Sequence, residues 1–411
     1  MNTPQVSCRS CGKRELITIL SLGKTPLANA LLTREQLSQK ERTFDLDLVF
    51  CPSCSLVQIT ETVPPEELFR EYFYLSSFSE TMLRHSEENV HELIQSRKLD
   101  ANSFVIEIAS NDGYLLQYYK RAGVPVLGIE PARNIAQTAV KRGIPTVCEF
   151  FDTGLAQKLV ADGKSADIVH ANNVLAHVPD LSGFVHGIQS LLKNSGVAII
   201  EVPYVKDMID RNEFDTIYHE HLCYFSLTAL DHLFRRHGLL ITDVQRLDIH
   251  GGTLRIHARK ENSESDLQSA VVDEMLAEEV AWVRNEEFYR GFGEEVERLR
   301  RDLVDMLSRL KGQGKRIAVY GASAKGSTLL NYFGLGSPLL DFVVDRSTIK
   351  QGHYTPGTHL AIYSPDVLLN QKPDYVLLLT WNFADEILQQ QAEYRKQGGR
   401  FIIPIPQVRV V

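Results

Sequence analysis

The sequence predicts an α/β protein in three parts, a small cysteine-rich domain followed by two Rossmann-like units. Four of the six cysteines form two Cys-x-x-Cys pairs near the N-terminus. From about residue 66 strand-like apolar runs alternate with helical stretches, the signature of a parallel sheet. A second strand–turn–helix series begins near residue 314. We therefore predict domains at residues 1–65, 66–262 and 314–411, with a linking helical segment at 263–313.

The composition excludes several classes of protein. The 411 residues are 44% hydrophobic and 23% charged, which is typical of a globular chain and not of a disordered one. A formal charge of −8 disfavours binding to a nucleic-acid backbone. No run approaches the roughly 20 apolar residues of a membrane helix, and the first residues lack the basic and apolar regions of a secretory signal. We expect a cytoplasmic protein with reduced thiols and no membrane or nucleic-acid partner.

The two cysteine pairs predict a metal site. Cys8 and Cys11 form the first pair, and Cys51 and Cys54 form the second. Four thiolates complete a tetrahedral zinc sphere and leave no open position, so the predicted zinc is structural rather than catalytic. Free cysteines and a thioredoxin-like redox pair are the alternatives. Cys223 is expected to be a small buried residue.

The middle part has the strand pattern of a nucleotide-binding sheet. Its predicted strands are Phe104–Ile108, Val126–Ile129, Ile168–Ala171 and Val197–Val202, and two antiparallel closing strands are predicted at Leu239–Leu247 and Thr253–Ala258.

The first of these strands leads through a turn of small residues into a helix. Such a turn exposes backbone amides to a ligand, and Glu130 at the end of the next strand is placed to accept hydrogen bonds from ribose hydroxyls. This pattern fits both NAD and S-adenosylmethionine (SAM). Three features favour SAM: Glu107 lies inside the strand, the turn lacks the G-x-G-x-x-G glycines, and a Phe150-Phe-Asp152 cluster follows the third strand.

The predicted cofactor contacts are therefore these nine residues: Glu107, Ala109, Asn111, Asp112, Gly113, Glu130, Phe151, Asp152 and Asn172. An α/β sheet without a ligand is the alternative.

The linking segment is rich in Glu, Arg and Leu. Its apolar residues recur at helical spacing, which predicts one long helix with a buried face that is interrupted near Gly291 and Gly293. The residues of that face are Val296, Leu299, Leu303, Met306 and Leu310.

The C-terminal part repeats the strand–turn–helix pattern. Strands are predicted at Ile317–Tyr320, Phe342–Val344, Tyr375–Thr380 and Arg400–Ile403. The amides of the Gly321–Gly326 turn, with Ser323, Lys325 and the later Lys350, suit a pyrophosphate group. We predict that they bind the substrate, and a purely structural or interdomain role is the alternative.

Two further segments complete a known pattern. Ile217-Tyr-His-Glu-His-Leu-Cys-Tyr-Phe-Ser226 and His250-Gly-Gly-Thr-Leu-Arg255 follow the cysteine pairs and the first turn, and precede the second α/β unit. With this combination the chain resembles, over essentially its whole length, the SAM-dependent nucleotide-sugar C-methyltransferases. That family includes enzymes that methylate C-3′ of dTDP-4-keto-deoxysugars. The resemblance implies a zinc-binding N-terminal domain, a methyltransferase middle domain and a C-terminal domain that closes over the sugar nucleotide.

A carbon atom next to a ketone becomes nucleophilic only after it loses a proton, so this chemistry needs a base and a group that stabilises the enolate oxygen. The segment offers four titratable side chains in succession, and in an extended segment His219 and His221 would share one face. The resemblance implies that His221 is the base and that Glu220 and Tyr218 hold or polarise the site. It also implicates Tyr72 or Tyr74, Asn173 and His177, and it makes Arg255 a substrate contact.

Other interpretations stay open at this point. His219 could be a structural histidine, His219 and His221 could hold a metal, Tyr72 and Tyr74 could be core aromatics, and Arg255 could pair with a surface acid. The competing functions are O- or N-methylation of a sugar or small molecule, a non-catalytic module that binds a sugar nucleotide or SAM, and an NAD-dependent oxidoreductase. The sequence leaves the sugar, the nucleotide, the pathway and the oligomeric state open, and a monomer is compatible with it.

Overall fold

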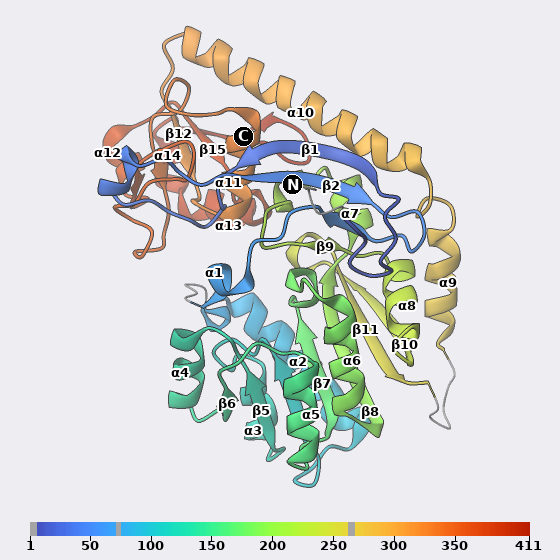
Figure 1. Ribbon diagram of the computed structural model, residues 1–411. Helices are drawn as coiled ribbons and strands as arrows, with labels where there is room; N and C mark the ends of the chain where they lie inside the picture. The colour runs from blue at the N-terminus through green and yellow to red at the C-terminus, as the bar shows by residue number, and fades with distance from the viewer. Residues whose placement is uncertain (1–5, 71–74, 262–267) are drawn as a thin grey trace.

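The computed structural model describes residues 6–70, 75–261 and 268–411, and its strands form three sheets. The middle sheet with its helices lies at one end of the molecule, and the C-terminal unit lies at the other (Figure 1). The N-terminal strands lie between them beneath a long helix (Figure 1). No helix in the described ranges has the length and apolarity needed to cross a bilayer.

The N-terminal sheet is antiparallel, with the strand order β1-β2-β3-β9. Its strands are β1 (Ile17–Thr25), β2 (Phe44–Phe50), β3 (Val57–Ile59) and β9 (Cys223–Tyr224). The fourth strand comes from the middle of the chain, where Val57 lies opposite Tyr224. Two segments that are far apart in sequence therefore share one ladder.

The middle sheet has seven strands in the order β10-β11-β8-β7-β4-β5-β6. They are β4 (Val105–Ile108), β5 (Val126–Ile129), β6 (Thr146–Val147), β7 (Ala166–Asn172), β8 (Leu192–Pro203), β10 (Leu239–Leu247) and β11 (Thr253–Lys260). Strands β4 to β8 are parallel, and β11 runs antiparallel to both β8 and β10, which confirms the predicted closing strands. The chain order reverses between β4 and β7, and ligands of such sheets bind at the carboxyl ends of the strands beside that point.

Helices cover both faces of this sheet because its strands are apolar on both sides. One face packs on α2 (Glu80–Arg97) and α3 (Leu116–Arg121), and the other packs on α5 (Thr153–Ala161), α6 (Leu181–Leu191) and α8 (Leu227–Arg235). The remaining helices of this region are α1 (Pro65–Phe69), α4 (Arg133–Lys141) and α7 (Val205–Asp210), with 3-10 turns η2 (Ser76–Phe78), η3 (Leu175–His177), η4 (Phe214–Thr216) and η5 (Ile249–Gly251); η1 (Glu35–Ser38) belongs to the N-terminal part.

The linking segment forms α9 (Ala270–Glu279) and α10 (Glu286–Gly312). The predicted interruption near Gly291 and Gly293 is wrong, because α10 continues through both glycines and the chain bends before residue 286 instead. The predicted apolar face is buried at Val296, Leu299, Leu303 and Leu310, together with Leu307, while Met306 is only partly buried.

The C-terminal sheet has the order β14-β13-β12-β15-β16-β17, parallel except for its last strand. Its elements are β12 (Ile317–Tyr320), α11 (Ala324–Phe333), β13 (Val343–Val344), β14 (Ile362–Tyr363), α12 (Val367–Gln371), β15 (Tyr375–Leu378), η6 (Trp381–Phe383), α13 (Ala384–Gln390), α14 (Ala392–Lys396), β16 (Arg400–Ile403) and β17 (Arg409–Val410). The four predicted strands are all present.

Helix α10 lies along β1 and joins the domains (Figure 1). The approach is closest at Gly293, where a Cβ atom would lie 2.9 Å from the backbone oxygen of Ile19. At Gly291, on the same helix, a Cβ atom would meet nothing within 4 Å. A side chain is therefore excluded by packing at one glycine and not at the other.

These two glycines give a matched pair of predictions. Gly293→Ala should lower the free energy of unfolding by about 1–3 kcal/mol, because it overpacks the contact between α10 and β1. Gly291→Ala should raise it by roughly 0.5–1 kcal/mol, because alanine is the better helix former. Thermal unfolding of both variants checks the signs, and equal effects would contradict the close approach.

Candidate active site and zinc centre

The four predicted zinc ligands meet at one point. The sulfur atoms of Cys8, Cys11, Cys51 and Cys54 all lie within 4.8 Å of one another, and the Cys8–Cys54 and Cys11–Cys51 pairs are each 3.5 Å apart. Zn–S bonds of about 2.3 Å in a tetrahedron place sulfurs about 3.8 Å apart, so the cluster fits zinc. No other group of His, Cys, Asp and Glu side chains in the described ranges comes together in this way, so His219 and His221 form no such metal site.

The zinc knuckle is tied directly to β3. The backbone N–H of Arg9, inside the first cysteine pair, donates to the side-chain oxygen of Gln58 at 2.8 Å. The Arg9 guanidinium donates to the backbone oxygens of Ile59 and Glu61. Because β3 pairs with β9, the metal site sets the position of the chain that leaves the Tyr218–His221 segment.

The predicted cofactor turn follows β4 in an unusual conformation. Ala109 has φ 55°, Asn111 has φ 48° and Gly113 has φ 80°, so two non-glycine residues occupy the left-handed region. Such strain persists where the surrounding structure fixes it, often at ligand sites. Here Glu130 fixes it, because its carboxylate accepts from the N–H groups of Asn111 and Ala132, both at 2.9 Å.

Buried polar atoms around this turn lack partners. Glu107 Oε2, Ser110 Oγ and Asn172 Oδ1 are buried and accept no hydrogen bond within the described part of the chain. Burial, and then the charges of Glu130 and Asp112, raise the pKa of Glu107 well above its usual value. Orphaned groups of this kind cost about 1–3 kcal/mol each unless a ligand satisfies them. SAM, with its ammonium group and ribose hydroxyls, fits them.

Other predicted cofactor residues have structural partners. Asp112 is fully buried and accepts from Arg142 at 2.6 Å and from Ser77 at 2.5 Å. Asp152 caps α5 by accepting from the N–H of Leu155 at 2.7 Å. The Phe151 ring packs edge-on against Phe184, with ring centroids 5.2 Å apart. These contacts are structural. Contact of Asp112, Phe151 and Asp152 with the cofactor stays a prediction.

The histidine-rich segment is a tight turn rather than an extended strand, because the N–H of His221 bonds to the backbone oxygen of Tyr218 at 2.8 Å. The expectation that His219 and His221 share a face therefore does not hold. His219 is buried against the N-terminal domain, with Nε2 3.2 Å from the backbone oxygen of Asp45. His221 turns instead toward Tyr218 and His177.

The tautomer of His221 follows from its partners. Its Nδ1 lies 2.8 Å from the backbone oxygen of Thr216, which can only accept, so Nδ1 carries a proton. Nε2 is then the acceptor, and it lies 2.9 Å from the Tyr218 hydroxyl. Burial, and then charge on His177, hold the pKa of His221 well below its usual value, so the ring is neutral at neutral pH.

His177 completes the cluster from η3. Its Nδ1 donates to the backbone oxygen of Glu220 at 2.6 Å, and its ring meets His221 edge-on with centroids 4.9 Å apart. Asn173, at the end of β7, has φ 55° and donates its N–H to the backbone oxygen of Glu201 at 2.8 Å. The predicted residues from two separate segments are thus brought to one place.

Glu220 is held by a residue that no sequence pattern indicated. Asn29 of the N-terminal domain donates its side-chain amide to Glu220 Oε1 at 2.6 Å, across 191 positions of chain. Burial raises the pKa of Glu220 to about 7. A single asparagine in a loop carries no periodic or spacing signal, so its role appears only in three dimensions.

One predicted residue, Arg255, is not brought to this cluster. Arg255 is 5% exposed and ion-paired with buried Glu201 at 2.7 Å, so its guanidinium is used inside the sheet rather than on a surface acid. The predicted substrate contact of Arg255 is therefore not supported. The Tyr72–Tyr74 segment lies outside the described residues.

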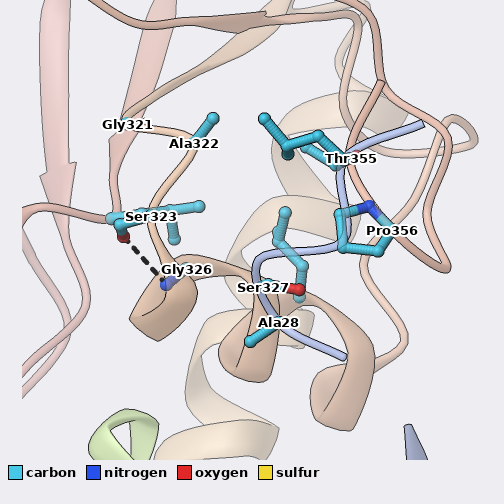
Figure 2. Close-up of a pocket in the computed structure, with 11 residues that line it drawn as sticks. Ala28, Gly321, Ala322, Ser323, Gly326, Ser327, Thr355 and Pro356 are labelled. Atoms are coloured by element: carbon cyan, nitrogen blue, oxygen red, sulfur yellow. Dashed lines mark hydrogen bonds between the residues drawn. The ribbon is translucent and has the colours of Figure 1, made fainter. Parts of the chain in front are cut away.

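The C-terminal turn faces the N-terminal loop across a small pocket. Figure 2 shows Gly321, Ala322 and Ser323 on one side of the pocket and Thr355 and Pro356 on the other. Ala28 of the N-terminal domain also lines the pocket. Small side chains leave backbone close to this space.

The three predicted phosphate contacts differ in what they do. Ser323 caps α11 by accepting from the N–H of Gly326 at 3.1 Å. Lys350 donates to the backbone oxygen of Ala322 at 2.8 Å, so it supports the turn. Lys325 forms no ion pair within the described ranges and lies over the Trp381 ring, 4.7 Å from its centroid. Of the two lysines, Lys350 is bound to the turn through its ammonium group and Lys325 is not.

The C-terminal domain also contacts the chain just before the Tyr218–His221 turn. Trp381 Nε1 donates to Asp215 at 2.7 Å, and Thr328 of α11 donates to the backbone oxygen of Ile217 at 3.1 Å. All three domains therefore meet around residues 215–221.

A mostly parallel seven-stranded sheet, with a strained turn and unpartnered buried polar atoms after β4, is compatible with a SAM-dependent methyltransferase, and the comparisons show that class. Residues 78–244 match a methyltransferase domain, residues 8–69 a zinc binding domain, and residues 248–406 a C-methyltransferase C-terminal domain. The chain is 37% identical over 409 residues to the C-methyltransferase NovU of Streptomyces niveus, an alignment that covers 99% of this chain and 97% of that relative. The chain belongs to this C-methyltransferase family, with SAM as its cofactor and zinc in its N-terminal domain.

Solved methyltransferases align with part of the chain. Magnesium protoporphyrin IX methyltransferase of Synechocystis, with bound SAM, is 15% identical, with 43% of this chain and 79% of that chain covered and a TM-score of 0.34. The 1,6-didemethyltoxoflavin-N1-methyltransferase of Burkholderia thailandensis is 20% identical, with 44% and 78% covered and a TM-score of 0.33.

Removal of a zinc ligand should impair methyl transfer from a distance. Cys51→Ser should lose the metal and lower turnover at least about 10-fold, because β3 and its partner β9 lose their anchor. Metal analysis and release of S-adenosylhomocysteine measure the two effects. Cys148→Ser, at an exposed cysteine outside the cluster, is the matched control and should change neither. A zinc-free variant with wild-type turnover would contradict the prediction.

Proposed function

We propose that this SAM-dependent C-methyltransferase acts on a nucleotide-linked 4-keto-deoxysugar, most simply a dTDP sugar, and methylates C-3′ through an enolate formed by His221. The observation that carries the proposal is the orientation of that histidine. Its Nδ1–H is bound to the Thr216 carbonyl, which leaves Nε2 as a basic nitrogen beside the Tyr218 hydroxyl. O- and N-methylation require no proton removal from carbon, so they do not need a base placed beside a ketone.

The proposed reaction has two steps. Nε2 of neutral His221 takes the proton from the carbon next to the ketone, directly or through the Tyr218 hydroxyl, and the electron pair moves to the ketone oxygen. SAM supplies a methyl group bound to a sulfonium. The enolate carbon bonds to that methyl, the carbon–sulfur bond breaks, and the ketone is restored. His221 then returns its proton to solvent.

Burial gives the histidine its base form. A ring whose pKa lies well below its usual value is unprotonated at neutral pH and can accept the proton. His177 and Glu220 keep the turn in place through the bond between Nδ1 and the Glu220 carbonyl. Once Nε2 has taken the proton it can donate to the Tyr218 oxygen, and the hydroxyl hydrogen of Tyr218 then becomes a donor for the enolate oxygen. Asn173 and the unplaced Tyr72 complete the set of proposed site residues.

The sugar nucleotide is proposed to lie against the C-terminal turn. The pocket between the two outer domains is lined by small residues such as Ser327, and Lys325 of the same helix supplies a cation that lies over Trp381. An ammonium group and helix N-terminal amides suit a pyrophosphate. Ser323 and Lys350 contribute by shaping the turn.

The base assignment is tested with His221→Asn. Asparagine retains a donor for the Thr216 carbonyl and removes Nε2, so methyl transfer should fall by roughly 10²–10⁴-fold. Incubation of the keto-sugar nucleotide in D₂O should show exchange of the C-3′ proton with wild-type protein and no exchange with the variant. Mass spectrometry measures the exchange.

His219→Gln is the matched control, two residues away. Glutamine keeps a donor near the position of Nε2, which faces Asp45 and not the cleft, so exchange and methylation should persist. Normal exchange by His221→Asn, with or without SAM, would overturn the base assignment.

Cofactor binding should depend on pH through Glu130. Burial raises the pKa of Glu130 to about 7, and its carboxylate form is the better acceptor for ribose hydroxyls. The affinity for SAM should therefore increase as pH rises through about 7 and decrease below it. Glu130→Gln should bind more weakly and lose this component.

Isothermal titration calorimetry at several pH values compares the two proteins. The titration of SAM itself is common to both, so their difference isolates Glu130. Parallel pH profiles for the wild type and a folded Glu130→Gln variant would contradict the assignment.

A further inference from the structure

The carboxyl group of Glu220 is held by a side chain from another domain. Glu220 is 6% exposed, and the one side chain in the described ranges that binds its carboxyl is the neutral amide of Asn29, at 2.6 Å. No lysine, arginine or histidine side chain pairs with this carboxyl there. A buried carboxyl with a single amide donor depends strongly on that donor for its orientation.

The loop that carries Asn29 is fixed on both sides. Its neighbour Ala28 lines the pocket opposite the Gly321–Ser323 turn, as Figure 2 shows. A few residues later, Leu32 exchanges two backbone hydrogen bonds with Tyr354 of the C-terminal domain, at 3.0 and 2.9 Å. The amide of Asn29 is therefore presented to the catalytic turn by an ordered segment and not by a free loop.

The backbone of Glu220 in turn fixes the positions of two histidines, His177 and His221. Its backbone oxygen accepts from His177 Nδ1 at 2.6 Å, and it lies inside the turn that closes from His221 N–H to the Tyr218 oxygen. A change in the position of residue 220 therefore moves both His177 and His221. The side chain of Asn29 touches Glu220 and reaches the reacting atoms only through it.

We propose that Asn29 is a positioning residue for methyl transfer: its amide orients Glu220, so that a loop of the zinc-binding domain fixes the Tyr218–His221 turn. This inference rests on the proposed function, because it takes that turn to be the site of proton removal.

The titration of Glu220 should report this bond. An amide that donates to a carboxylate favours the ionised form, so loss of Asn29 should raise the pKa of Glu220. The other titratable groups nearby are His177 of η3 and His221 of the same turn, and Lys325 of α11 acts electrostatically on His221. None of them binds the Glu220 carboxyl within the described residues.

The experiment uses the zinc-loaded full chain with Asn29→Ala and Asn29→Asp. Gln36→Ala is the matched control, because it removes another neutral amide in the same domain, one that accepts from Thr33 on the surface. Carbon-13 NMR follows the Glu220 carboxyl, assigned with Glu220→Gln. Steady-state kinetics on the keto-sugar nucleotide give kcat and KM across pH.

Asn29→Ala should raise the Glu220 titration midpoint and lower kcat about 10-fold, the size expected for one hydrogen bond to a charged group. KM should change by less than about 2-fold, and Gln36→Ala should match wild type. Asn29→Asp keeps the shape of the side chain, so it remains informative if the alanine variant unfolds. Its two carboxyls should share one proton, so its kcat should fall as pH rises and both groups ionise.

An unchanged Glu220 midpoint with wild-type kcat in Asn29→Ala, or a wild-type pH profile in Asn29→Asp, would overturn the proposal. Failure of the proposed function looks different. In that case wild-type protein does not turn over the keto-sugar nucleotide, while the midpoint of Glu220 still shifts in the variants.

Discussion

The pairing of β3 with β9 is the interaction on which the geometry of the Tyr218–His221 turn depends. The chain leaves His221 and within two residues enters a strand whose partner belongs to the zinc-binding domain. Leu222 sits between them, with its oxygen accepting from Ile59 N–H at 3.0 Å and its N–H donating to the Ala176 oxygen at 2.8 Å. A short turn gains little order from its own hydrogen bonds, so its geometry is imposed by these longer-range ones.

Burial then decides the charge state of the cluster. Desolvation disfavours every charged form, so the same dry environment lowers the pKa of His221 and His177 and raises the pKa of Glu220 to about 7. On the surface the pKa shifts would instead come from neighbouring charges, and salt would screen them. Here the histidines stay neutral because they are buried, and the hydrogen bonds to backbone oxygens select which nitrogen carries the proton.

Much of the fold could be predicted because the strands are apolar and bounded by turn residues. β10, β12 and β16 have the predicted bounds, and four cysteines with knuckle spacing indicated the metal site. The prediction that His219 and His221 share one face failed because the segment is not extended. Alternating side chains lie on one face only where a strand pairs with a neighbour, and here an internal hydrogen bond closes a turn. Asn29 and the pairing of Arg255 with Glu201 depend on contacts between distant segments, which leave no local signal.

A carbon acid explains why three domains meet at one turn. An enolate in water is quenched by protons, so its formation requires a base that is dry, neutral and fixed before the substrate arrives. The predicted cofactor turn belongs to the middle domain, but the proposed base lies on a segment whose main-chain partners come from both outer domains, Ile59 on one side and Thr328 on the other. Helix α11 takes part in both arrangements, because its Ser327 lines the pocket in Figure 2 and its Thr328 donates to the backbone oxygen of Ile217. The proposed substrate pocket and the Tyr218–His221 turn are therefore connected through one helix of the C-terminal domain.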